Sequence, residues 1–149
     1  MVEMNEPPNA PPEQCYRILI FAGGFCHEVK EECLREGFEV VLVSNPEEAV
    51  QFLRSQDHVD AAIAPAFMED QTVFDFLLGV RKMPENVSAP IMILSIEPSQ
   101  LAAFCTPAVE TAAKLLGAYK FVTMPKLNSR QVMRELKAML PDKPSKCQS

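Results

Sequence analysis

Two residue types able to do chemistry stand side by side at Cys26 and His27, shortly after the glycine pair Gly23-Gly24. They lie near the start of a segment with helical spacing, where the helix dipole attracts anions and lowers the pKa of a thiol. Thiolate chemistry or an anion-binding loop is one hypothesis for this region. The signal is weak, because the glycines match no nucleotide-binding motif and a lone cysteine more often packs in a core.

The other reactive residues form no recognisable cluster. Glu69 and Asp70 are adjacent acids in a loop, and His58 lies in a polar turn, so we expect these three to be solvated. No CxxC pair occurs, which argues against a zinc site or a disulfide framework. We therefore expect no metal, no cofactor and five free thiols, at Cys15, Cys26, Cys33, Cys105 and Cys147.

Composition and charge narrow the class of protein. The 149 residues are 48% hydrophobic, which suits one soluble domain with a sizeable core. A net charge of -6 disfavours nucleic acid as a partner. No apolar stretch approaches the roughly 20 residues of a membrane span, and the start is acidic and proline-rich, so we expect a cytoplasmic protein. We expect disordered tails at residues 1–16 and 142–149 around a domain at 17–141.

Short apolar runs alternate with helical patterns along the predicted domain. Asn45-Pro46 starts a helix as an N-cap followed by proline, and Gly37 and Gly117 follow helix ends. Thr106-Pro107 is interpreted as the start of the fourth helix. Such alternation predicts a parallel sheet between two layers of helices. The five predicted strands are at 17–22, 39–43, 60–64, 90–95 and 119–123.

In such sheets a ligand site lies beyond the carboxyl ends of the strands. We therefore expect any chemistry just after Ala22, Ala64, Ser95 and Thr123.

The order and spacing of several short motifs form a larger pattern. In chain order these are ILIF at 18–21, GFEV at 37–40, NPEEA at 45–49, Asp60, Met68, PIMILS at 90–95, Gly117-Ala118 and FVTMP at 121–125. Together they resemble the receiver domain of two-component response regulators over about residues 17–140. The resemblance implies a flavodoxin-like (βα)5 fold, a doubly wound parallel sheet with strand order 2-1-3-4-5. The connection at 96–106 is longer than usual for this family.

The residues that such receivers use for phosphoryl transfer are largely replaced. The resemblance implies an acidic pair at positions 22 and 23, a phosphoacceptor aspartate at position 65 and a lysine at position 124. This chain has Ala22, Gly23, Pro65 and Met124 there. Without the carboxylates there is no nucleophile and no hard-oxygen ligand set for magnesium. Of the expected pocket only Ser95 and the proline at 125 remain. Asp60 is an acid, but it lies at the opposite end of its strand, roughly 17 Å away at 3.3 Å per residue.

These substitutions predict a degenerate receiver that is not an enzyme and is not phosphorylated on aspartate. We expect a phosphorylation-independent interaction module with a protein partner in a signalling pathway. In the family such contacts use the face of the fourth helix, fifth strand and fifth helix, which includes Phe121 here and also allows a homodimer. The alternative is a small flavodoxin-like enzyme or ligand binder that uses Gly23, Gly24 and Cys26.

Overall fold

The protein is described by a computed structural model that covers residues 3–5, 15–22, 26–55, 58–67, 73–82, 89–96 and 99–142. Six strands form one sheet in the order β1-β3-β2-β4-β5-β6. Five of them are parallel, and their order confirms the predicted 2-1-3-4-5 arrangement. The strands are β1 (Glu3–Asn5), β2 (Arg17–Phe21), β3 (Glu39–Val43), β4 (Ala61–Pro65), β5 (Ile91–Ile96) and β6 (Lys120–Met124).

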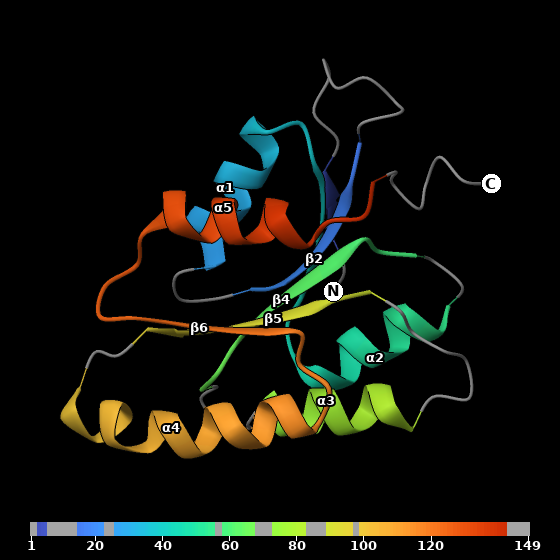
Figure 1. Cartoon of the computed structure of the whole chain (residues 1–149). Coiled ribbons are helices and arrows are strands. Elements are labelled where there is room, and N and C mark those ends of the chain that lie inside the picture. Colours follow the sequence, from blue (N-terminus) through green and yellow to red (C-terminus); the bar gives the residue numbers. More distant parts are fainter. Residues whose placement is uncertain are drawn as a thin grey trace.

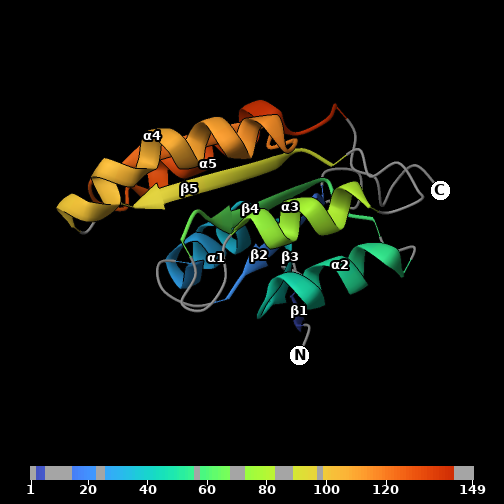
Figure 2. The ribbon, with the colours of Figure 1, turned by 90° about the horizontal axis from the view of Figure 1, so that it is seen from below.

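Helices cover both faces of the sheet, as expected for strands that are apolar on both sides. Figures 1 and 2 show α1 and α5 on one face and α2, α3 and α4 on the other. Two separate core clusters match these two layers, because alternate residues of each strand point to opposite faces. The helices are α1 (Cys26–Arg35), α2 (Pro46–Arg54), α3 (Val73–Arg81), α4 (Gln100–Leu115) and α5 (Ser129–Met139).

Several predicted helix ends are confirmed in atomic detail. The Asn45 side chain accepts a hydrogen bond from the backbone N–H of Glu48, and Pro46 occupies the first helical turn of α2. Gly37 and Gly117 both have positive φ angles, 87° and 108°, after α1 and α4. Glycine adopts this left-handed conformation without steric cost, and the chain therefore turns from helix to strand at these points.

The predicted start of the fourth helix at Thr106 is wrong. Helix α4 begins at Gln100, where the Ser99 hydroxyl accepts from the backbone N–H of Ala102 at 3.2 Å. Pro107 lies inside the helix, where it removes one backbone hydrogen bond without ending the helix. The segment at 100–106 is therefore not an extended connection but the first turns of α4.

The N-terminal segment also differs from expectation. We expected residues 1–16 to be disordered, but Glu3–Asn5 form β1, which pairs antiparallel with the outer edge of β3. This pairing uses backbone groups, so it needs little apolar character in the side chains. Cys15 is buried, and the Tyr16 hydroxyl donates to the carbonyl oxygen of Pro141 at 2.7 Å. The described residues thus include a strand before position 17, while residues 6–14 and 143–149 of the two predicted tails lie outside them.

Within the described ranges, no helix combines the length and the apolar character needed to cross a bilayer.

Candidate functional site

Four of the residues predicted to line a pocket lie at the carboxyl edge of the sheet. Pairing of β4 with β5 places Pro65 beside Leu94, one residue before Ser95. Pairing of β5 with β6 places Met124 beside Ile96, directly after Ser95. Ala22 follows β2 at the same edge and donates its N–H to the carbonyl of Val43 at 2.7 Å. Gly23 and Gly24 lie outside the described residues, and the other four predicted residues, Ala22, Pro65, Ser95 and Met124, are described at this edge.

Pro65 ends the central strand β4 and replaces the expected nucleophile. The N–H groups of Ala62 and Ala66 both donate toward β5, so the Pro65 nitrogen faces the β2 side. The ladder between β4 and β2 has already ended at Ile63. Proline has no N–H and so cannot continue this ladder, and it stands at the last residue of the strand. The half-buried ring offers no oxygen to attack a phosphoryl group.

Met124 fills the position at which the resemblance implies a lysine. Its side chain is buried, and its sulfur accepts the backbone N–H of Asn128 at 3.2 Å. Two lysines lie near Met124 in the sequence, but neither takes its place. Lys120 forms an ion pair with Glu135 at 3.1 Å, and Lys126 is exposed after the strand. The buried thioether supplies no cation to neutralise a phosphoryl group.

Ser95 survives from the expected pocket, but its hydroxyl is engaged elsewhere. It is fully buried, and its Oγ lies 3.2 Å from Oγ1 of Thr106 in helix α4. The Thr106 hydroxyl donates to the carbonyl of Ala102 at 2.8 Å. Since that hydroxyl has one hydrogen, Ser95 is the donor of the bond between the two side chains. The pair ties the end of β5 to the middle of α4.

Cys26 does not have the properties of a reactive thiol. It is the first residue of α1 and only 1% exposed, within the core cluster beneath α1 and α5. Burial raises the pKa of the Cys26 thiol to about 12, opposite to the lowering expected at a helix start. Desolvation of the charged form thus outweighs the helix dipole. The predicted thiolate chemistry is not supported by this environment.

Phe121 on β6 was predicted as a partner-binding residue. Its side chain is 9% exposed and belongs to the core cluster beneath α2, α3 and α4. A ring buried to this extent leaves little surface for another protein to contact. Thr123, two residues further along β6, is exposed.

Among the described residues, no three or more His, Cys, Asp or Glu side chains are grouped so that they could hold a metal ion. Glu69 and Asp70, the loop acids considered from the sequence, lie outside the described residues.

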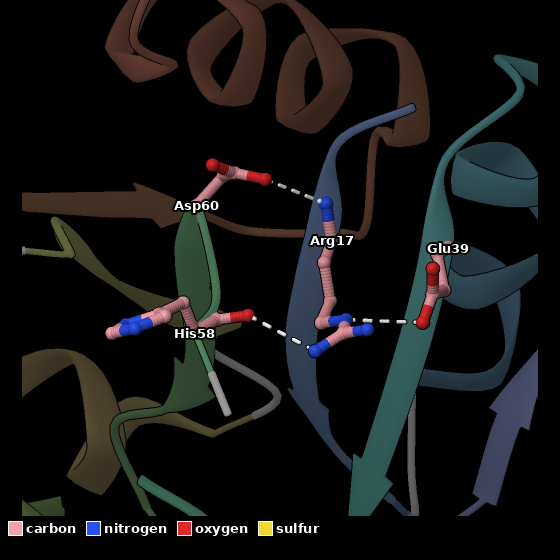
Figure 3. Close-up of polar contacts among 4 residues, drawn as sticks. All are labelled: Arg17, Glu39, His58 and Asp60. Atoms are coloured by element: carbon pink, nitrogen blue, oxygen red, sulfur yellow. Dashed lines mark hydrogen bonds and ion pairs between the residues drawn. The ribbon is translucent and has the colours of Figure 1, made fainter. Parts of the chain in front are cut away.

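A buried polar network lies at the opposite, amino edge of the sheet (Figure 3). Arg17 Nε donates to the carboxylate of Glu39 at 3.0 Å, and its Nη1 donates to the carbonyl of His58 at 3.3 Å. Asp60 accepts the backbone N–H of Arg17 at 2.8 Å. Glu39 and Asp60 are 0% and 2% exposed. The network joins β2, β3 and the entrance to β4, and we assign it a structural role.

Sequence reasoning missed this network, although a signal was present. Arg17 and Glu39 are the first residues of two parallel strands that pair side by side, with Arg17 opposite Glu39. Opposite charges at equivalent positions of neighbouring strands attract each other across the sheet. Asp60 was correctly placed at this far end, away from the candidate pocket.

The sheet order and the two helical layers match the flavodoxin-like fold that response-regulator receiver domains have. The chain is similar to the chemotaxis response regulator CheY4 of Vibrio cholerae, with 22% identity, a TM-score of 0.67 and coverage of 85% of this chain and 100% of that one. It is also similar to the receiver domain of sensor histidine kinase PA1611 from Pseudomonas aeruginosa, with 18% identity, a TM-score of 0.63 and coverage of 84% and 97%. That structure holds a magnesium ion in its active-site cleft.

Sequence comparison gives a shorter match to the same class. The two-component response regulator ORR12 of Oryza sativa subsp. japonica is 30% identical over 69 residues, which are 46% of this chain and 57% of that protein. The chain thus spans just over half the length of this relative. No protein-family model matches the chain.

Proposed function

We propose that this chain is a receiver-like signalling protein that acts by binding another protein and is not phosphorylated on aspartate. The observation that carries the proposal is the chemistry of the carboxyl edge. Proline ends β4 where a nucleophile is required, and a buried methionine stands where a cation is required. Phosphoryl transfer needs both a nucleophile and positive charge to stabilise the moving group.

The remaining hydroxyl supports the same proposal. Ser95 donates to Thr106 and is fully buried, so its hydroxyl already has a partner within the fold. A hydroxyl held in this way does not need phosphate to hold β5 and α4 together. We infer a single resting arrangement in which binding competence depends on the amount of protein and on its partners.

A direct test uses acetyl phosphate with magnesium chloride, followed by intact-mass measurement and separation on a phosphate-binding gel. We expect no acid-labile adduct on this chain, while a phosphorylatable receiver treated in parallel becomes labelled. A stable aspartyl-phosphate adduct on this chain would contradict the proposal. A magnesium-dependent change in its NMR spectrum at the carboxyl edge would contradict it as well.

The alternative of a small flavodoxin-like enzyme is the weaker candidate. It depends on a reactive thiol at Cys26, and that thiol is buried with a raised pKa. We therefore propose that the chain is not an enzyme. Its contacts would come from the face formed by α4, β6 and α5, where α4 contributes the largest exposed apolar side chains.

A further inference from the structure

Strand β3 is the outermost of the five parallel strands, and β1 covers its outer edge. Residues 40–42 pair on one side with β2. On the other side the same residues pair with Glu3–Asn5 of β1, which runs antiparallel. Figure 2 shows β1 beside β3 at the end of the sheet away from β5. Without β1, this side of β3 would present a row of unpaired backbone N–H and C=O groups.

The sequence of β3 has none of the features that usually protect the edge of a sheet. Residues 40–43 are Val-Val-Leu-Val, and Val40, Val41 and Val43 are 0% exposed. Glu39 is the charged residue of the strand, but its carboxylate is bonded to Arg17 of β2 at 3.0 Å. An apolar, β-branched strand with an open edge pairs readily with strands of other molecules. The edge of β3 therefore needs a cover.

The opposite edge of the sheet, at β6, is different. In the part of the chain that the structure describes, β6 is the last strand of the sheet and pairs with β5. It begins at Lys120, carries exposed Thr123 and is followed by Pro125. Charged residues, polar residues and proline are typical of protected edge strands. The additional strand thus covers the edge whose own residues do not protect it.

Strand β1 replaces this apolar edge with a short and acidic one. It has three residues, Glu3-Met4-Asn5, and Glu6 follows directly. Pro7 and Pro8 come next, and proline has no N–H with which to continue a ladder. A short strand with acidic residues, interrupted by proline, is a poor template for further pairing.

We propose that β1 is a detachable strap. It closes the outer edge of β3, and on its release this edge pairs with an extended segment of another molecule, antiparallel as β1 is. Three residue pairs hold the strap, against five between β3 and β2. Because a contact with fewer pairs opens more readily, β1 is released while the rest of the sheet stays folded. The edge of β3 is separate from the carboxyl edge and from α4, so the strap is independent of the proposed function.

Proline variants of the full chain test whether β1 closes the edge. Successive residues of a strand direct their N–H groups to opposite sides, so only one of Met4 and Asn5 donates to β3. Of Met4→Pro and Asn5→Pro, we therefore expect one to speed amide exchange at residues 40–42 by about tenfold or more. The other is its matched control and should exchange like the wild type. Unchanged exchange in both variants overturns the proposal.

A disulfide tests the register and locks the strap. Glu3 and Leu42 lie opposite each other. Opposite residues of an antiparallel pair have Cα atoms about 4.5–5.5 Å apart, which suits a disulfide. The variant Glu3→Cys, Leu42→Cys, made with Cys105 and Cys147 changed to serine, should form the bond on oxidation. Exchange at residues 40–42 should then be slower than in the reduced form of the same variant. Failure of the two cysteines to join would contradict the pairing of β1 with β3.

Sedimentation measures whether an opened edge pairs with other molecules. In a purified sample, the strand edge available to an opened β3 is that of another copy. We expect the proline variant with fast exchange to form larger species that increase with concentration. The oxidised, locked variant should form none of them. Fast exchange together with the sedimentation of the wild type would show that the opened edge does not dock strands.

Discussion

The two edges of the sheet use polar residues in opposite ways. At the amino edge, the carboxylates of Glu39 and Asp60 are buried and bonded to Arg17. At the carboxyl edge, where receivers carry out their chemistry, Pro65 and Met124 provide neither negative nor positive charge. The chain therefore has buried charge where it joins strands at the amino edge, whereas Pro65 and Met124 at the carboxyl edge are uncharged.

The two edges of the sheet differ in how their buried polar groups are stabilised. A buried carboxylate is tolerated only when it is paired and hydrogen-bonded, and Arg17 provides that at the amino edge. A cluster of carboxylates at the carboxyl edge would repel one another unless a metal ion were bound. With no such cluster in the sequence at these positions, the edge is held by apolar packing and by the bond between Ser95 and Thr106. The comparison teaches that the described residues stabilise one edge of the sheet by paired charge and the other by apolar packing and a hydroxyl pair.

The largest effect is expected at the amino edge from Glu39→Ala. The change leaves the Arg17 guanidinium, whose side chain is 14% exposed, without its ion-pair partner. Breaking a buried pair on one side typically costs about 3–5 kcal/mol of unfolding free energy. Urea denaturation measures this loss. The exposed pair of Lys137 with Glu36 is the control, and Glu36→Ala should cost less than about 1 kcal/mol. Equal losses for the two variants would contradict the contrast between buried and exposed pairs.

A smaller loss is expected from Asp60→Ala. This change leaves the backbone N–H of Arg17 without its carboxylate acceptor, and an unsatisfied buried donor costs about 1–3 kcal/mol. Asp60→Asn is the matched control, because the amide oxygen still accepts a hydrogen bond. Denaturation should therefore rank the asparagine variant between the wild type and the alanine variant. Equal unfolding free energies for the asparagine and alanine variants would show that the hydrogen-bond acceptor at position 60 does not contribute to stability.

At the carboxyl edge, the hydroxyl pair is expected to contribute about 1 kcal/mol. A double-mutant cycle with Ser95→Ala and Thr106→Val measures the coupling between the two side chains. We expect a coupling of about 0.5–1.5 kcal/mol, together with faster amide exchange in the first half of α4. Additive losses in the cycle, with unchanged exchange, would mean that the pair does not hold the helix.

The smallest effect at neutral pH concerns the thiols. Burial raises the pKa values of Cys26 and Cys33 to about 12, so both are neutral and shielded at neutral pH. We expect iodoacetamide to modify the half-buried Cys105 well before either of them. Stability from the two neutral thiols is fully present below pH 9.0 and is lost as the pH rises toward about 12, because the unfolded chain ionises first. Early alkylation of Cys26 at pH 7 would restore the enzyme hypothesis.

Local sequence was sufficient for most of the fold. The alternation of apolar runs and helical patterns gave the five parallel strands, and Asn45 and Gly37 marked true helix ends. These features depend on neighbouring residues, through capping side chains and backbone conformation. The same local reasoning failed at Pro107, since proline favours a helix start but is also tolerated inside a helix that other contacts stabilise.

The sequence predicted which residue types occupy the candidate site, but not which of their side chains are buried. Residue types alone established that Pro65 and Met124 cannot carry out the chemistry of an aspartate and a lysine. Burial of Cys26 and Phe121 could not be read from their positions, because each depends on which helix packs over which side of the sheet.

By itself, the sequence determined the order of helices and strands and the uncharged residue types at positions 65 and 124, since both follow from residue type and spacing. Only the tertiary structure decided that Arg17 meets Glu39, that Ser95 meets Thr106, and that α4 presents Leu101 and Phe104 to solvent. The physical reason is that these relations join residues far apart in the chain, or depend on which side of a helix the rest of the fold covers.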